Sequence, residues 1–67
     1  MSYENYMEMK SRELQIMART RCARIANTHE NMGIDKAMMN AVSRIVDQPE
    51  ITEKQKRLLA TFMTRIK

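Results

Sequence analysis

The chain has very little of the residues that break helices or that build cross-linked and catalytic sites. Its 67 residues include one glycine, one proline, one cysteine, one histidine and no tryptophan. A single cysteine excludes an internal disulfide, and no cluster of ligands suits a structural zinc. One cysteine and one histidine without paired carboxylates also leave little from which to build an active site. We therefore expect a protein that is not an enzyme and that holds no metal and no cofactor.

Long apolar runs are also missing, so no segment of the sequence is expected to cross a membrane. The first twelve residues are polar and include Glu4 and Glu8, which argues against a signal peptide. The lone thiol suits a reducing compartment. These features predict a soluble, cytoplasmic protein without membrane contacts.

The length of the chain allows one small domain over residues 1–67. A domain of this size buries only about 60% of the surface that its unfolded chain exposes, so a monomer has marginal stability. Small domains compensate with disulfides, metals, regular helix packing or self-association. With the first two excluded, helix packing and self-association remain.

The spacing of apolar residues predicts an all-α domain with three helices, separated by Gly33 and Pro49. The first helix is long and covers about residues 3–32. Two shorter helices follow over about residues 36–47 and 53–66. The apolar residues expected to face inward are Tyr3, Met7, Leu14, Ala18, Cys22, Ile25, His29, Met32, Met38, Met39, Ala41, Val42, Ile45, Val46, Leu58, Leu59, Phe62, Met63 and Ile66.

Polar residues at the expected helix starts support this division. Ser2 and Asp35 can each cap the helix that follows them. Thr52 with Gln55 three residues later matches the capping box, in which each side chain bonds the backbone N–H of the other residue. The third helix is therefore expected to begin just after Thr52.

The unequal helix lengths predict a homodimer. A helix over residues 3–32 is about 45 Å long, whereas each shorter helix spans only about 20 Å. A shorter helix that packs along the C-terminal half of the long helix leaves the N-terminal half of the long helix uncovered. Met9, Ile16 and Ala23 form a second apolar stripe almost opposite the first. A helix that is apolar on two sides usually contacts something on both. The residues expected at the interface with a partner are Tyr3, Tyr6, Met9, Ile16 and Ala23.

Basic residues gather in two stretches without acids, from Leu14 to His29 and after Glu53. The net charge of +4 and the pI near 9.6 favour a polyanion or an acidic protein surface as partner. Arginine binds phosphate through a planar, bidentate fork. The residues expected to contact nucleic acid are Lys10, Arg12, Arg19, Arg21, Arg24, Lys54, Lys56 and Arg57.

On a helix these basic residues do not share one face. Arg12 and Arg19 project to one side, and Lys10, Arg21 and Arg24 to another. We therefore expect binding that depends on assembly with a second copy, which doubles each basic group.

The leading hypothesis is a non-enzymatic homodimer that binds nucleic acid. RNA is favoured because Tyr3 and Tyr6 can stack on unpaired bases. The alternative is an inhibitor or regulator of an acidic protein, docking through the exposed apolar face of the long helix. Small size and high methionine content are typical of accessory regulators and phage-type inhibitors. A third interpretation is that the charges form a solvated face and nothing more.

Other patterns are weaker. Cys22 and His29 lie seven residues apart, about 10 Å along a helix, too far for a nucleophile–base hydrogen bond, so we expect both in the core. In a helix-turn-helix the glycine of the turn precedes a buried valine by about six residues. Gly33 precedes Val42 by nine, so the signal for a helix-turn-helix is weak. Most of the eight methionines are expected to fill the core, with Met9 and Met17 at the surface.

Overall fold

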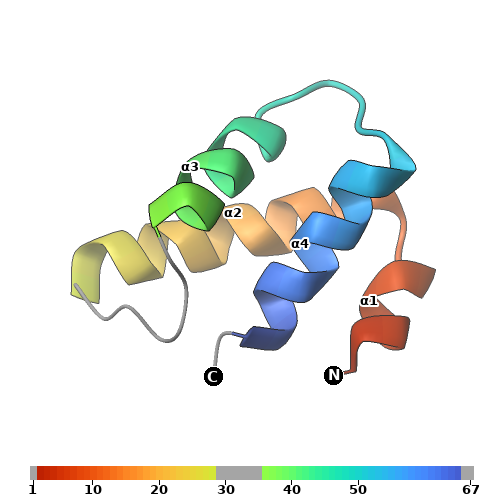
Figure 1. Cartoon of the computed structure of the whole chain (residues 1–67), viewed down its shortest axis with the longest axis horizontal. Helices are drawn as coiled ribbons and strands as arrows, with labels where there is room; N and C mark the ends of the chain where they lie inside the picture. Colours follow the sequence, from red (N-terminus) through yellow and green to blue (C-terminus); the bar gives the residue numbers. More distant parts are fainter. Residues whose placement is uncertain (1, 29–35, 66–67) are drawn as a thin grey trace.

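The computed structural model describes residues 2–28 and 36–65, and in these ranges it contains four helices and no strand. The helices are α1 (Tyr3–Glu8), α2 (Ser11–Thr28), α3 (Lys36–Ile45) and α4 (Glu53–Arg65). Helix α4 crosses α2 and contacts all three other helices, with α3 and α1 on different sides of it (Figure 1). The prediction of an all-α fold is confirmed for the described part of the chain.

The prediction of one continuous helix over residues 3–32 is wrong. Met9 adopts an extended conformation, with φ −71° and ψ 153°, and ends α1. Its N–H still donates to the Tyr6 carbonyl at 3.2 Å, and α2 begins two residues later at Ser11. A straight helix of the predicted length, about 45 Å, would exceed the 28 Å long axis of the molecule. The predicted end of that helix lies outside the described residues.

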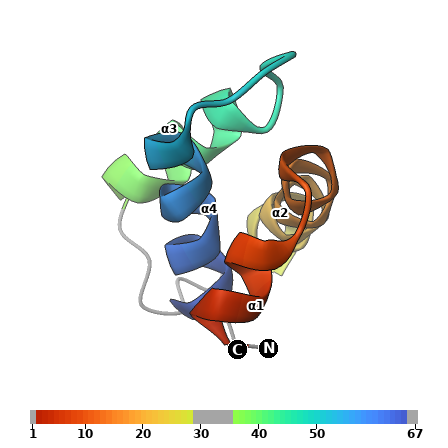
Figure 2. The same ribbon diagram turned by 90° about the vertical axis from the view of Figure 1, so that its right-hand side faces the viewer.

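The break turns α1 back so that it packs against α4 (Figures 1 and 2). Tyr6 becomes only 7% exposed and joins the core. Burying a large apolar side chain stabilises a fold by about 1.5–3 kcal/mol. This gain offsets the lost helical hydrogen bonds at the break, each worth about 1 kcal/mol net. The N-terminal segment therefore finds its cover within its own chain, and the argument from helix length for a dimer no longer holds.

Two of the three predicted caps are confirmed. The Ser2 hydroxyl accepts a hydrogen bond from the Asn5 N–H at 3.4 Å at the start of α1. At α4, the Thr52 N–H donates to Gln55 Oε1 at 2.9 Å and the Gln55 N–H donates to Thr52 Oγ1 at 3.2 Å. Asp35, the third, lies outside the described residues.

The core lies where α2, α3 and α4 meet, with Tyr6 added from α1. Its buried apolar residues are Tyr6, Leu14, Ala18, Ile25, Val42, Ile45, Val46, Leu59, Ala60, Phe62 and Met63. Most were predicted from spacing, although Tyr6 and Ala60 were not. Tyr3, predicted to face inward, is 39% exposed. His29, Met32 and Ile66 lie outside the described residues.

Candidate nucleic-acid interface

A shallow hollow of about 230 Å³ follows the surface of α2. It is lined by Ile16, Met17, Thr20, Arg21 and Arg24, and we call it the α2 hollow. Positions three, four or seven apart lie on one side of a helix, so α2 alone supplies the lining. Arg24 is exposed and Arg21 half-buried. The hollow therefore sets two guanidinium groups beside an apolar surface.

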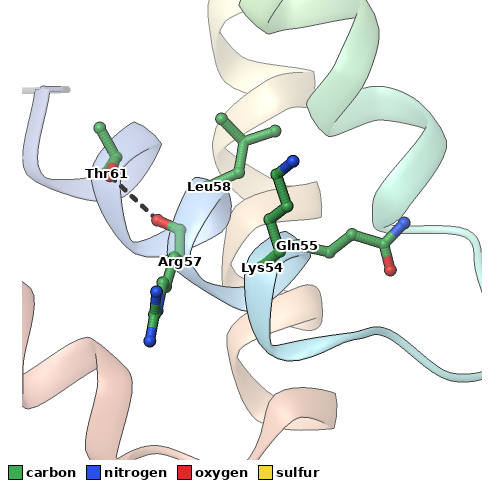
Figure 3. A pocket seen from close by; sticks show the side chains of 5 residues that line it. All are labelled: Lys54, Gln55, Arg57, Leu58 and Thr61. Carbon is green, nitrogen blue, oxygen red and sulfur yellow. Dashed lines mark hydrogen bonds between the residues drawn. The ribbon is translucent and has the colours of Figure 1, made fainter.

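A second hollow of about 380 Å³ lies on α4 (Figure 3). It is lined by Lys54, Gln55, Arg57, Leu58 and Thr61, and we call it the α4 hollow. The side chains of Lys54 and Arg57 extend in different directions from the helix (Figure 3). They therefore do not converge on one small anion, and this spread suits charges distributed along an extended ligand.

Each hollow also contains a threonine whose proton is already engaged. Thr20 Oγ1 donates to the Ile16 carbonyl at 3.1 Å, and Thr61 Oγ1 donates to the Arg57 carbonyl at 2.9 Å (Figure 3). A hydroxyl that has donated its proton still offers lone pairs as an acceptor. The hydrogen-bond donors that face a bound anion are therefore the basic side chains and, in the α4 hollow, the side-chain amide of Gln55.

Arg19 lies apart from both hollows and points toward the end of α3. Its Nη1 is 3.7 Å from Asp47 Oδ1, and the two side chains are 73% and 66% exposed. The other basic side chains within residues 2–28 and 36–65 form no ion pair. Ion pairs this exposed contribute less than about 1 kcal/mol, so Asp47 holds Arg19 weakly.

The remaining predicted nucleic-acid contacts are scattered. Lys10 is exposed at the junction of α1 and α2, Arg12 is exposed on α2, and Lys56 is half-buried on α4. None of the three lines the α2 hollow or the α4 hollow. The structure thus groups Arg21 with Arg24, and Lys54 with Arg57, and leaves the other predicted residues outside these groups.

The residues predicted at a partner interface have different surroundings. Tyr6 is buried in the core and Met9 is half-buried against it. The predictions that Tyr6 contacts a partner and that it stacks on a base are therefore wrong, because its side chain is not accessible. Tyr3 at 39% and Ile16 at 57% are the exposed large apolar side chains of the described chain, and Ala23 is exposed as well.

Gln15 is a structural residue that sequence reasoning missed. Its side chain is only 3% exposed, and its Nε2 donates to the carbonyls of Ile45 and Gln48, both at 2.9 Å. The signal was its spacing, because Gln15 lies three residues before Ala18 and seven before Cys22 on the inner face of α2. Gln15 holds the end of α3 and the turn that carries Asp47 against α2.

Cys22 does not have the character of a catalytic nucleophile. Burial raises the pKa of its thiol, and a side-chain hydrogen bond with Ser43 opposes this by a smaller amount. The thiolate is the reactive form, so a raised pKa lowers reactivity at neutral pH. His29 lies outside the described residues, so its predicted place beside the core stays a prediction. Among the described side chains, no three of His, Cys, Asp or Glu are grouped to hold a metal.

Comparison of the chain with protein-family models, with curated proteins and with solved structures finds no match. None of α1 to α4 is both long enough and apolar enough to span a membrane. The function is therefore argued from the chemistry of the two hollows and their surroundings.

Proposed function

We propose that this protein is a non-enzymatic nucleic-acid-binding protein that holds phosphates with basic side chains of α2 and α4. One observation carries the proposal: each hollow places two basic side chains beside an apolar surface, and none of the four is in an ion pair within the described chain. These residues are Arg21, Arg24, Lys54 and Arg57.

Unpaired cations on an exposed surface favour a polyanion for a physical reason. A basic side chain that is already paired with a carboxylate must lose that partner before it contacts phosphate. A free one contacts phosphate directly and releases condensed counterions from the nucleic acid, which drives binding at low salt. The α2 and α4 hollows meet this condition.

The apolar part of each hollow supports a single strand as the ligand. Met17 and Leu58 offer surfaces for a base, whose faces duplex nucleic acid keeps inside its stack. Tyr3 remains exposed enough to stack on an unpaired base, whereas Tyr6 does not. RNA is the favoured ligand in this proposal because recognition of RNA concentrates on such unpaired bases.

The test is binding of a fluorescently labelled single-stranded RNA, followed by anisotropy at low salt. We expect the Arg21→Gln/Arg24→Gln variant to bind about tenfold more weakly, because it loses two phosphate contacts. Circular dichroism of this variant should match the native protein, since both side chains line a hollow at the surface and neither belongs to the core.

Lys36→Gln/Arg44→Gln is the matched control. It removes the same charge from exposed positions on α3 that line neither hollow. We expect its affinity to fall by only about twofold, through net charge. Absence of RNA binding by the native protein at low salt would refute the proposal, and so would an equal loss in both double variants.

The alternative of a protein-binding regulator has less support. The apolar face of the long helix through which it would dock carries Tyr3, Met9 and Ile16, but Met9 is half-buried against the core. Ile16 is the main apolar group left on that surface. This alternative predicts that Ile16→Lys abolishes a complex with an acidic protein and that RNA does not compete for it.

Two further parts of the proposal rest on the single cysteine of the chain. A cytoplasmic setting is proposed from the single thiol of Cys22, which suits a reducing compartment. Absence of catalysis is proposed because the raised pKa of this thiol disfavours a nucleophile. The predicted homodimer now needs an argument other than helix length.

A further inference from the structure

The outer side of α2 carries a stripe made of Ile16, Thr20 and Ala23, and we call it the outer stripe. All three side chains are exposed, and Ile16 is the most exposed large apolar residue of the described chain at 57%. Their spacing of four and then three residues places them on one side of the helix. Helix α2 lies at one edge of the molecule, and no other described helix covers its outer side (Figure 2).

We propose that the outer stripe pairs with the outer stripe of a second copy of this chain, with the two α2 helices antiparallel about a twofold axis near Thr20. An axis midway between Ile16 and Ala23 brings Ile16 of each copy over Ala23 of the other. A large side chain then packs on a small one twice, and the small residue lets the helices approach closely. The stripe is in this sense complementary to itself, as a twofold interface requires.

Charge beside the stripe supports the same pairing. Glu13 and Arg24 lie on the same flank of α2, because eleven residues make almost three full turns. A twofold axis between antiparallel helices brings equal flanks together. Glu13 of one copy and Arg24 of the other then lie about 3 Å apart along the helix direction, within reach of an ion pair. Symmetry forms this pair twice.

The opposite flank also tolerates a second copy. Arg19 lies close to the proposed axis, where it would face Arg19 of the second copy. The repulsion is reduced because each Arg19 is 3.7 Å from Asp47 of its own chain. Both flanks therefore carry charges of both signs, which favours a second copy over a uniformly acidic partner.

The pairing has a consequence for binding, and this consequence alone rests on the proposed function. Arg21 and Arg24 line the flank that meets its own equivalent across the axis. The α2 hollows of the two copies then lie on the same side of the dimer. Basic groups too few for firm binding in one chain become a longer surface along a strand, on which the two Arg21 groups stay unpaired and each Arg24 must leave Glu13 before it contacts phosphate.

Sedimentation velocity over a range of protein concentrations at low salt tests the pairing. The native protein should show a concentration-dependent dimer. Ala23→Glu places a carboxylate under Ile16 of the other copy and should weaken the dimer by about tenfold or more. Ala37→Glu is the matched control, because Ala37 is an exposed alanine on α3, and this variant should dimerise like the native protein.

A charge exchange tests the geometry itself. Glu13→Arg and Arg24→Glu should each weaken the dimer by about tenfold, since each removes two symmetric ion pairs and adds repulsion. Combined in one chain, they should restore the native dimer to within about twofold. Only a direct contact between these positions predicts the restoration.

The outcomes separate the pairing from the proposed function. A native protein that stays monomeric at its highest soluble concentration overturns the pairing, as does a combined variant that fails to recover. A dimer that does not bind RNA leaves the pairing in place and refutes only the function. RNA binding by Ala23→Glu with native affinity would show that the function does not need the dimer.

Discussion

The side-chain amide of Gln15 on α2 donates to the carbonyl of Ile45, the last residue of α3, with an N to O distance of 2.9 Å. The same nitrogen donates to the Gln48 carbonyl, also at 2.9 Å. Carbonyls at the C-terminal end of a helix lack partners within the helix. A buried amide from thirty residues earlier in the chain supplies one here. This contact fixes where α3 ends against α2.

Replacing Gln15 with leucine should destabilise the fold. Gln15→Leu keeps a side chain of similar length but removes the amide donor from both carbonyls. The Ile45 carbonyl still accepts from the Gln48 N–H at 3.1 Å, whereas the Gln48 carbonyl loses its donor, and the loss should cost about 1–3 kcal/mol. Urea unfolding followed by circular dichroism measures this as a lower midpoint with little change in slope. An unchanged midpoint would show that the two hydrogen bonds do not contribute.

Gln15→Glu gives the same experiment a pH control. The introduced carboxyl is buried among carbonyls, so burial should raise its pKa in the folded state. Its contribution to stability is then present below the unfolded pKa and lost as the pH rises through the folded one. The variant should therefore unfold more easily at neutral than at acidic pH, relative to Gln15→Leu.

The capping box at the start of α4 should be measurable in isolation. Thr52→Ala removes the oxygen that accepts from the Gln55 N–H at 3.2 Å and should cost about 1 kcal/mol in the free energy of unfolding. Thr52→Ser keeps that oxygen and should remain within about 0.5 kcal/mol of the native protein. Thermal unfolding of the three proteins makes the comparison, and equal losses in both variants would exclude a capping role.

Cys22 should make the stability depend on pH under alkaline conditions. Burial raises the pKa of its thiol, so the folded chain keeps this proton where the unfolded chain has lost it. The resulting stability is fully present below the ordinary thiol pKa and is lost as the pH rises through the raised value. Relative to Cys22→Ala, the native protein should therefore lose stability above about pH 8.5. Urea unfolding of both proteins at neutral and alkaline pH tests this, and a constant difference would contradict it.

Periodicity predicted most of the core because apolar spacing on one helix depends on local sequence. Leu14, Ala18 and Ile25 on α2 are buried as expected, and so are Leu59 and Phe62 on α4. The start of α4 was also predictable, since both halves of its capping box lie within four residues. Local signals of this kind do not require knowledge of how the helices pack.

The break at Met9 was not predictable by the same means. No glycine or proline marks it, and local preferences favour continuing the helix. The break is decided by burial of Tyr6 where α1 packs on α4, a helix that begins at Glu53, and such a distant contact leaves no local trace. The burial of Gln15 was not predicted for a related reason. Apolar spacing gives no signal for a polar residue on the inner face of a helix.

The candidate site was predictable in part. Helical spacing separated Arg12 and Arg19 from Arg21 and Arg24, and the structure places only the second pair in the α2 hollow. The ion pair of Arg19 with Asp47 depends on how α2 packs against the end of α3. The sequence shows both residues but not their proximity, which follows from the position that Gln15 imposes on α3.

The salt dependence of RNA binding tests the central claim most directly. The measurement is the affinity for a single-stranded RNA at several salt concentrations, for the native protein and for Arg21→Gln/Arg24→Gln. Each phosphate contact on a single strand contributes about −0.7 to the slope of log affinity against log salt, so four contacts predict about −3. The double variant should reduce the steepness by about 1.4, because it removes two of these contacts. A slope near zero, or the same slope in both proteins, would contradict phosphate binding by these arginines.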